Sequence, residues 1–216
     1  MYKTKYLREF MQGPVFNYLK KTNVSPEFLT LFRIIFAFIT GIILFFGNYW
    51  LSLIFLTLAQ FVFMIDYVDG PLARYRKRFS TVWQKADRVM HYVISALFLF
   101  AITISYFIKT ENYVMLTVGI IGFLAIIYTL LLNILWYGKL GFPLTQEDKE
   151  KSKRENTGIL TKFYSFLGID IPFSLFFIFF IFNLISISIV FFSLLKTVIF
   201  INKIFYLRKW QKPKKR

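Results

Sequence analysis

Cysteine is absent from this 216-residue chain, so neither a disulfide bond nor a catalytic thiolate is available. Histidine occurs once, and acidic residues are scarce, with 11 Asp and Glu against 27 Lys and Arg. Polar surface is also in short supply, because 57% of the residues are hydrophobic and only 18% are charged. A soluble domain of this length could not cover its surface from such a composition. The chain is therefore predicted to lie in a membrane.

Six apolar runs approach or reach the roughly 20 residues of helix that cross a bilayer. The predicted spans are 28–47, 50–69, 89–108, 112–137, 166–183 and 185–206. The fifth is interrupted at its start by Asp170 and Pro172, so five spans remain an alternative. No cleavable signal peptide is expected, because the polar and basic N-terminal stretch precedes a first apolar run of spanning length. The predicted fold class is an all-α integral membrane protein with six transmembrane helices.

Basic residues are concentrated in alternate connections. Lys and Arg cluster in 1–27, 74–88, 139–163 and 203–216, whereas the 47–50 turn carries no charge. Because positive loops stay in the cytoplasm, both termini and these connections are expected there, which requires an even number of spans. The expected location is the cytoplasmic membrane of a bacterium or archaeon. Attraction to anionic membrane lipid accounts for the basicity, so no nucleic-acid partner is expected.

Residues 1–27 are predicted to form a cytoplasmic segment at the membrane surface. Their interspersed aromatic and basic residues favour an N-terminal interfacial amphipathic helix, or two short helices broken near Gly13-Pro14, over a flexible basic tail. One six-helix membrane domain is expected over 28–207, followed by a basic cytoplasmic tail at 208–216. No internal repeat is visible in the sequence.

Ionisable residues gather at the ends of the second and third predicted spans. Asp66 and Asp69 are three residues apart and share a helix face, and Asp87 and His91, four apart, share another. The 74–86 connection turns the chain back, so the two faces can meet near the cytoplasmic boundary. A charge at the centre of a membrane helix costs about 2.5 kcal/mol or more. A chain that keeps several together is predicted to use them.

These residue types suit a metal ion and a phosphate-bearing ligand. Four oxygen or nitrogen ligands from two helices can hold one or two divalent cations, and Mg²⁺ is commonly bound by carboxylates together with substrate phosphates. Gly70 and Ala73 remove bulk where a ligand must approach the backbone, and Arg74 can donate to phosphate. Arg76 and the two basic residues after it are interpreted as ordinary positive charges on the cytoplasmic side.

This stretch resembles the signature of the CDP-alcohol phosphotransferase (phosphatidyltransferase) family, D-x2-D-G-x2-A-R-x8-G-x3-D-x3-D. Matches at the same spacing are Asp66, Asp69, Gly70, Ala73, Arg74 and Asp87. Trp83 stands where the family has its second glycine, and His91 stands where it has the last aspartate. The run Ser25–Arg33 also resembles the Pro-Asn-x-x-Thr-x-x-Arg opening of the family's first span, with Glu27 in place of the asparagine. This second resemblance puts Thr30 and Arg33 near the site.

The resemblance implies an enzyme that transfers a substituted phosphate group from a CDP-alcohol to a second alcohol and releases CMP. The donor would be CDP-diacylglycerol or a CDP-linked head group, and the product a phospholipid or a related membrane phosphodiester. The implied cofactor is a divalent metal, Mg²⁺ or Mn²⁺, as two ions held by Asp66, Asp69, Asp87 and His91. The implied catalytic residues are His91 and Asp87. The implied substrate-binding residues are Gly70, Ala73, Arg74, Trp83, Thr30 and Arg33. Members of the family also form homodimers, which would make a second copy of the chain a partner.

The departures from the family pattern leave alternatives open. His91 can bind a metal ion or accept a proton, but the replacement removes a negative charge, weakens a second Mg²⁺ and shifts the preference toward Mn²⁺. Trp83 could fill part of the nucleotide pocket, stack on the base, or anchor the chain at the interface. Lys196, within the last span, could snorkel to the interface or bind an acceptor phosphate.

Two other functions compete with the enzyme. One is a catalytically silent lipid- or nucleotide-binding membrane protein of the same fold. The other is a small transporter that uses the buried acids as an ion pathway, against which the lack of an internal repeat argues.

The charge asymmetry generates a topology prediction. Cysteines introduced at Lys77 and Lys151, in a chain without native cysteine, should not react with a membrane-impermeant thiol reagent added outside intact cells. They should react once the membrane is opened, because both connections are expected in the cytoplasm. Labelling of either cysteine from outside would contradict the six-span topology.

Overall fold

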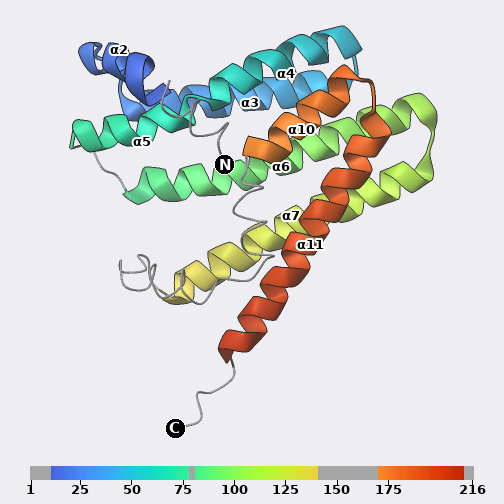
Figure 1. Cartoon of the computed structure of the whole chain (residues 1–216). Helices are drawn as coiled ribbons and strands as arrows, with labels where there is room; N and C mark the ends of the chain where they lie inside the picture. The colour runs from blue at the N-terminus through green and yellow to red at the C-terminus, as the bar shows by residue number, and fades with distance from the viewer. Residues whose placement is uncertain (1–10, 78–80, 141–169, 212–216) are drawn as a thin grey trace. The chain divides into compact units, whose positions relative to one another are not determined.

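The computed structural model describes residues 11–77, 81–140 and 170–211, and every regular element among them is a helix (Figure 1). The helices divide into two units, Met1–Glu111 and Asn112–Arg216. The first unit contains η1 (Met11–Val15, a π-helical turn), α2 (Phe16–Lys21), α3 (Pro26–Phe46), α4 (Tyr49–Phe63), α5 (Asp66–Tyr75) and α6 (Thr81–Thr110). The second unit contains α7 (Tyr113–Leu140), α10 (Asp170–Ile181) and α11 (Ile185–Gln211).

Helix α3 is the centre of the first unit, because α4, α5 and α6 all pack against it. The core between these helices contains buried apolar side chains, among them Ala37, Leu44, Leu56, Val68 and Leu99. Gly41 lets α6 approach closely, since a Cβ added there would lie 2.6 Å from Leu97 Cγ. At the other edge of the unit, η1 and α2 pack on α5.

Local sequence fixes both ends of α3. The Ser25 hydroxyl accepts a hydrogen bond from the Phe28 backbone N–H at 3.1 Å, and Pro26 occupies the first turn, where its missing N–H costs nothing. The helix ends at Gly47, whose φ of +70° suits a residue without Cβ. Lys109 of α6 donates to the Gly47 carbonyl oxygen and so ties this turn to the end of α6.

The second predicted span is broken where the acidic motif begins. Helix α4 ends at Phe63, Met64 and Ile65 form a turn, and α5 starts at Asp66. The Ile65 carbonyl oxygen accepts from the backbone N–H groups of Val68 and Asp69, which begins the new helix. The break therefore places two acidic residues in the first turn of α5, where the helix dipole favours negative charge.

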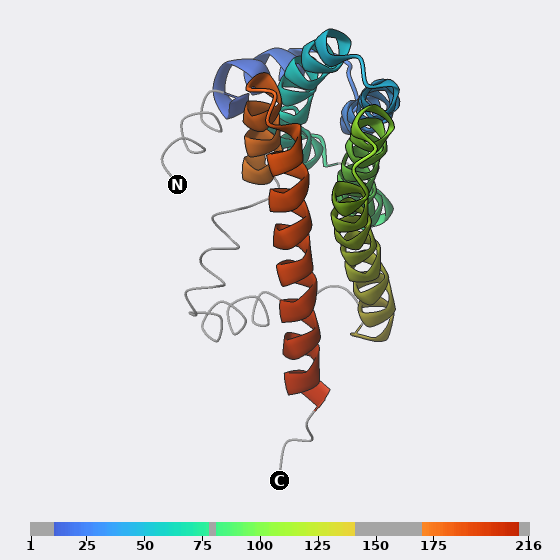
Figure 2. The same ribbon diagram turned by 90° about the vertical axis from the view of Figure 1, so that its right-hand side faces the viewer.

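The second unit is built on α11, which packs along α7 (Figure 2) and also contacts α10. Aromatic pairs mark both contacts: the rings of Tyr128 and Phe200 are 6.0 Å apart, and those of Phe176 and Phe192 are 5.2 Å apart in an edge-to-face arrangement. Gly122 allows the close approach of α7 and α11, because a Cβ there would lie 2.6 Å from Ser193 Cα.

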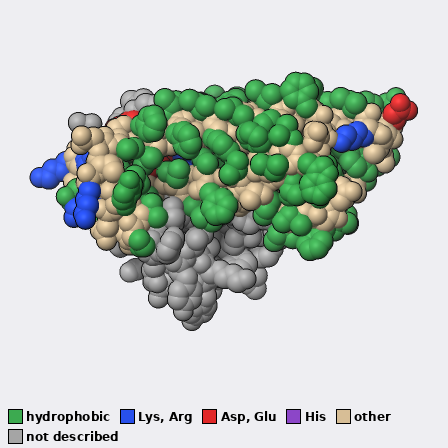
Figure 3. All heavy atoms as spheres, turned by 90° about the horizontal axis from the view of Figure 1, so that it is seen from above, with side chains coloured by type: hydrophobic (Ala, Val, Ile, Leu, Met, Phe, Trp, Pro, Cys, Tyr) green, Lys and Arg blue, Asp and Glu red, His purple; other side chains and the backbone are tan. Residues whose placement is uncertain are grey.

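Five stretches of the described helices are long and apolar enough to cross a membrane. They are Pro26–Phe46, Tyr49–Tyr75, Val89–Thr110, Tyr113–Leu135 and Ile185–Phe205. Large hydrophobic side chains on them face outward, as lipid contact requires, and Figure 3 shows hydrophobic side chains spread over the described part of one face. These features support an integral membrane protein.

The predicted fifth span, 166–183, is not confirmed, and neither is the count of six. Its described part is α10, whose 12 residues are too few to cross a bilayer, and residues 166–169 lie outside the described part of the chain. The N-terminal amphipathic helix is also not confirmed, because residues 1–10 lie outside the described part. The remainder forms η1, with Pro14 inside it, followed by α2.

The contact between Gly122 and Ser193 generates a stability prediction. Gly122→Ala should lower the free energy of unfolding by about 1–3 kcal/mol, because the added methyl group overpacks α7 against the backbone of α11. Ser193→Ala is the matched control: among the described residues its buried hydroxyl has no hydrogen-bond partner, so its removal should leave stability unchanged or raised. Thermal unfolding in detergent, followed by tryptophan fluorescence, measures both. An unfolding temperature of Gly122→Ala equal to that of the wild type would contradict the close packing.

Candidate active site

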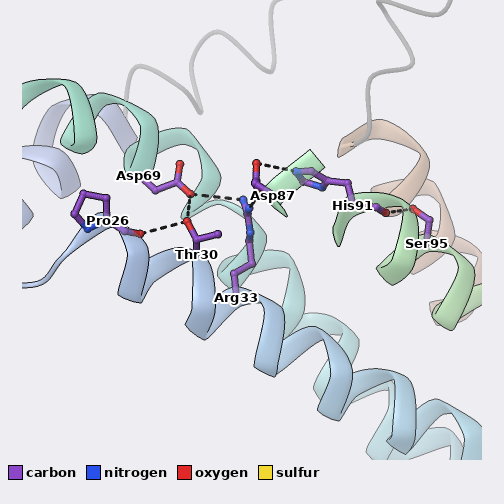
Figure 4. Close-up of polar contacts among 7 residues, drawn as sticks. All are labelled: Pro26, Thr30, Arg33, Asp69, Asp87, His91 and Ser95. Atoms are coloured by element: carbon purple, nitrogen blue, oxygen red, sulfur yellow. Dashed lines mark hydrogen bonds and ion pairs between the residues drawn. The ribbon is translucent and has the colours of Figure 1, made fainter. Parts of the chain in front are cut away.

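The polar residues of the first unit meet where α3, α5 and α6 come together (Figure 4). Asp69 lies in the first turn of α5, with 14% of its side chain exposed. The Thr30 hydroxyl of α3 is 3.1 Å from Asp69 Oδ2 and 3.2 Å from the Pro26 carbonyl oxygen, and it can donate to one of them at a time. The predicted proximity of Thr30 to the acidic motif is thus present in the structure.

Arg33, one turn further along α3, lies between two carboxylates. Its side chain is 2% exposed, its Nη1 is 3.9 Å from Asp69 Oδ2, and its Nη2 donates to Asp87 Oδ1. Asp69 belongs to α5 and Asp87 to α6, so one guanidinium connects three helices. A buried guanidinium needs such partners, because leaving it unpaired away from water would cost several kcal/mol.

His91 follows one turn after Asp87 on α6. Its Nε2 is 3.7 Å from Asp87 Oδ2, and its backbone carbonyl oxygen accepts from the Ser95 hydroxyl at 2.8 Å. The side chain of His91 is 16% exposed and that of Asp87 is 27% exposed, so solvent reaches both. Asp87 therefore stands between a permanent cation, Arg33, and an imidazole that can take up a proton.

Arg76, which follows the end of α5, is not an ordinary solvent-facing charge. Its guanidinium donates to the backbone carbonyl oxygens of Leu19, Thr22 and Val24. It thereby fastens the segment that precedes α3 to the end of α5. Beside it, the Tyr75 ring packs edge-on against Phe16, 6.1 Å between centroids, which adds to the docking of α2 on α5.

The other residues of the acidic motif lie on α5 together with Asp69. Apart from its chain neighbours and its own helix backbone, no described atom lies within 4 Å of a Cβ added at Gly70, so this point beside Asp69 is open. Ala73 is partly exposed, and Arg74 is exposed and can turn toward a phosphate. The side chains of Asp66 and Trp83 lie outside those that the structure describes. Lys196 lies on α11 and belongs to the second unit.

A divalent metal ion fits the chemistry of these donors. Asp69 and Asp87 offer the carboxylate oxygens that hard cations prefer, His91 adds a nitrogen, and the space at Gly70 gives a ligand access. Among the described side chains, no three acidic or histidine residues form a complete metal site. The remaining acidic residue of the motif, Asp66, has its backbone one turn from Asp69 on α5.

Helices of spanning length with paired charges at their junction define a multi-span membrane protein with a polar site. The family model of the CDP-alcohol phosphatidyltransferases matches residues 23–205, and the chain belongs to this family. Family membership implies phosphatidyl transfer from a CDP-alcohol in membrane lipid synthesis. No curated protein matches the sequence.

The structure brings Thr30, Arg33, Asp69, Asp87 and His91 together, as their places in the motifs predict. It adds one feature that the motifs do not carry: Arg33 contacts carboxylates, whereas the sequence analysis assigns it to the substrate. The sequence does contain a signal, since an arginine in an apolar helix needs an acidic partner. This signal does not identify which acidic residue is the partner of Arg33. The role of Arg76 has no comparable signal, because its partners are backbone groups.

Proposed function

We propose that this protein transfers a substituted phosphate group from a CDP-alcohol to a second alcohol in a metal-dependent reaction that releases CMP. The observation that carries this proposal is the arrangement of Asp69 and Asp87 on either side of Arg33, with His91 next to Asp87. Together with family membership, it supports the proposal, because carboxylates can bind a divalent cation and an imidazole can accept a proton.

Asp66, Asp69 and Asp87 would hold the divalent ion or ions, Mg²⁺ or Mn²⁺, and the one free lone pair of the His91 imidazole would be left to accept a proton. The ion, when bound, supplies positive charge that stabilises the diphosphate and the departing CMP. Gly70 and Ala73 give the nucleotide access to the backbone, and the exposed Arg74 donates to a phosphate oxygen. Trp83 is the residue proposed to contact the base.

The bond changes assign His91 its task. The acceptor hydroxyl oxygen forms a bond to the phosphorus next to CMP, the bond from that phosphorus to the CMP oxygen breaks, and the hydroxyl proton must leave. The His91 imidazole can accept this proton. The Asp87 carboxylate, whose Oδ2 is 3.7 Å from His91 Nε2, stabilises the imidazolium that results.

The carboxylates generate the main activity prediction. In a panel of CDP-alcohols with Mg²⁺ or Mn²⁺, Asp69→Asn and Asp87→Asn should each lower the rate of CMP release by roughly 100-fold or more, because each removes a charge from the reaction centre. Chelation of the metal should abolish CMP release by the wild type. Glu111→Gln, an exposed acidic residue just after the end of α6, is the control and should keep the wild-type rate. An Asp69→Asn rate close to wild type would refute the metal assignment, and no CMP release by the wild type would favour the silent relative.

His91 generates a second activity prediction. His91→Ala should abolish CMP release, whereas His91→Asp should keep part of it by restoring the acidic residue of the family pattern. Rates measured from pH 5 to 9 test this. Full activity of His91→Ala across that range would assign the proton transfer to another group.

A further inference from the structure

Arg33 holds a position that differs from that of a substrate-binding arginine. It is 2% exposed, and its two terminal nitrogens point to carboxylates on different helices, Asp69 on α5 and Asp87 on α6 (Figure 4). Arg74, by contrast, is exposed on α5. Of these two arginines, the exposed one can reach a diphosphate, while the buried one is engaged by the protein's own acidic groups.

The chemistry of arginine suits this engagement. Its guanidinium is charged at all accessible pH values and presents a rigid fork of donors, which can join two carboxylates at once. Without a cation between them, two partly buried carboxylates would repel each other and drive α5 and α6 apart. With Arg33 in place, the repulsion is offset by a charge that belongs to α3 and cannot diffuse away.

We propose that Arg33 is a positioning residue, a resident cation that holds Asp69 and Asp87 at a fixed separation and does not contact the substrate. The inference rests on the proposed function only in that these two carboxylates are taken as metal ligands. Arg33 keeps the two ligands together in the absence of metal, so that metal binding does not have to assemble them. The bridge itself stands whether or not the protein is an enzyme.

A double-mutant comparison in chelator tests the bridge. The full chain in detergent, with EDTA present, is unfolded thermally for the wild type, Arg33→Met, Asp87→Asn and the double variant. Arg33→Met should lower the unfolding temperature by at least about 4 °C. The double variant should recover at least half of that loss, because one of the two carboxylates that lost the compensating Arg33 charge has been neutralised. If the double variant loses as much unfolding temperature as the two single variants together, the proposal is overturned.

Arg76→Met is the matched control, because Arg76 is also an engaged arginine but its recorded partners are backbone carbonyl groups. It should lower the unfolding temperature to the same extent with and without Mn²⁺, and Asp87→Asn should not restore it. Mn²⁺ should raise the unfolding temperature of Arg33→Met more than that of the wild type, because the metal replaces the missing positive charge between the carboxylates. If Mn²⁺ binds and raises both unfolding temperatures equally, the bridge is contradicted.

Arg33→Lys keeps the charge, loses the fork, and provides a test should Arg33→Met fail to fold. A positioning role predicts that kcat for CMP release falls by about 10–100-fold while KM for the CDP-alcohol is unchanged. A rise in KM at unchanged kcat would show substrate contact and overturn the proposal. Electron paramagnetic resonance of Mn²⁺ separates the metal site of the proposed function from the positioning role of Arg33. If no Mn²⁺ binds to the wild type, the metal site is refuted. The stability comparison in EDTA still decides the role of Arg33, because it uses no metal.

Discussion

The contact of one buried guanidinium with two carboxylates is the interaction on which the first unit depends. Arg33 is placed by α3, Asp69 by α5 and Asp87 by α6, so each helix contributes one charge to the same point. In an apolar protein such charges are stable only as a set. A shift of any of the three helices would separate these charges. The packing of α5 and α6 on α3 therefore depends on the pairing of the charges, and the pairing depends on the packing.

The break between α4 and α5 makes this arrangement compatible with a spanning segment. In an uninterrupted helix, Asp66 and Asp69 would lie on the side of a continuous apolar cylinder. The turn at Met64 and Ile65 instead puts them in the first turn of a new helix. Backbone N–H groups there favour negative charge, so part of the cost of the acidic pair is met by the helix itself. Arg76 then holds the far end of α5 to the segment that precedes α3.

The sequence predicts the site better than the fold around it. Residues that share a helix face, such as Asp87 and His91, follow from spacing alone, and the motif register brings Thr30 and Arg33 to the same place. The partners of Arg33 and Arg76 do not follow, because they lie 36 or more residues away along the chain and depend on how helices pack. The break at Met64 also lacks a signal, since no proline or glycine marks it. Composition predicts spanning helices but does not decide whether 166–183 is one of them.

The presence of His91 in place of an aspartate changes the electrostatics in two opposing directions. One negative charge fewer weakens the attraction of the site for a second divalent ion. The same change lowers the repulsion that an anionic diphosphate meets on entering. Arg33 acts in the same sense, because its fixed positive charge offsets one of the two carboxylates that it contacts. In the proposed reaction, the site would therefore rely less on bound metal to neutralise its own carboxylates, and a larger share of the metal's charge would act on the diphosphate.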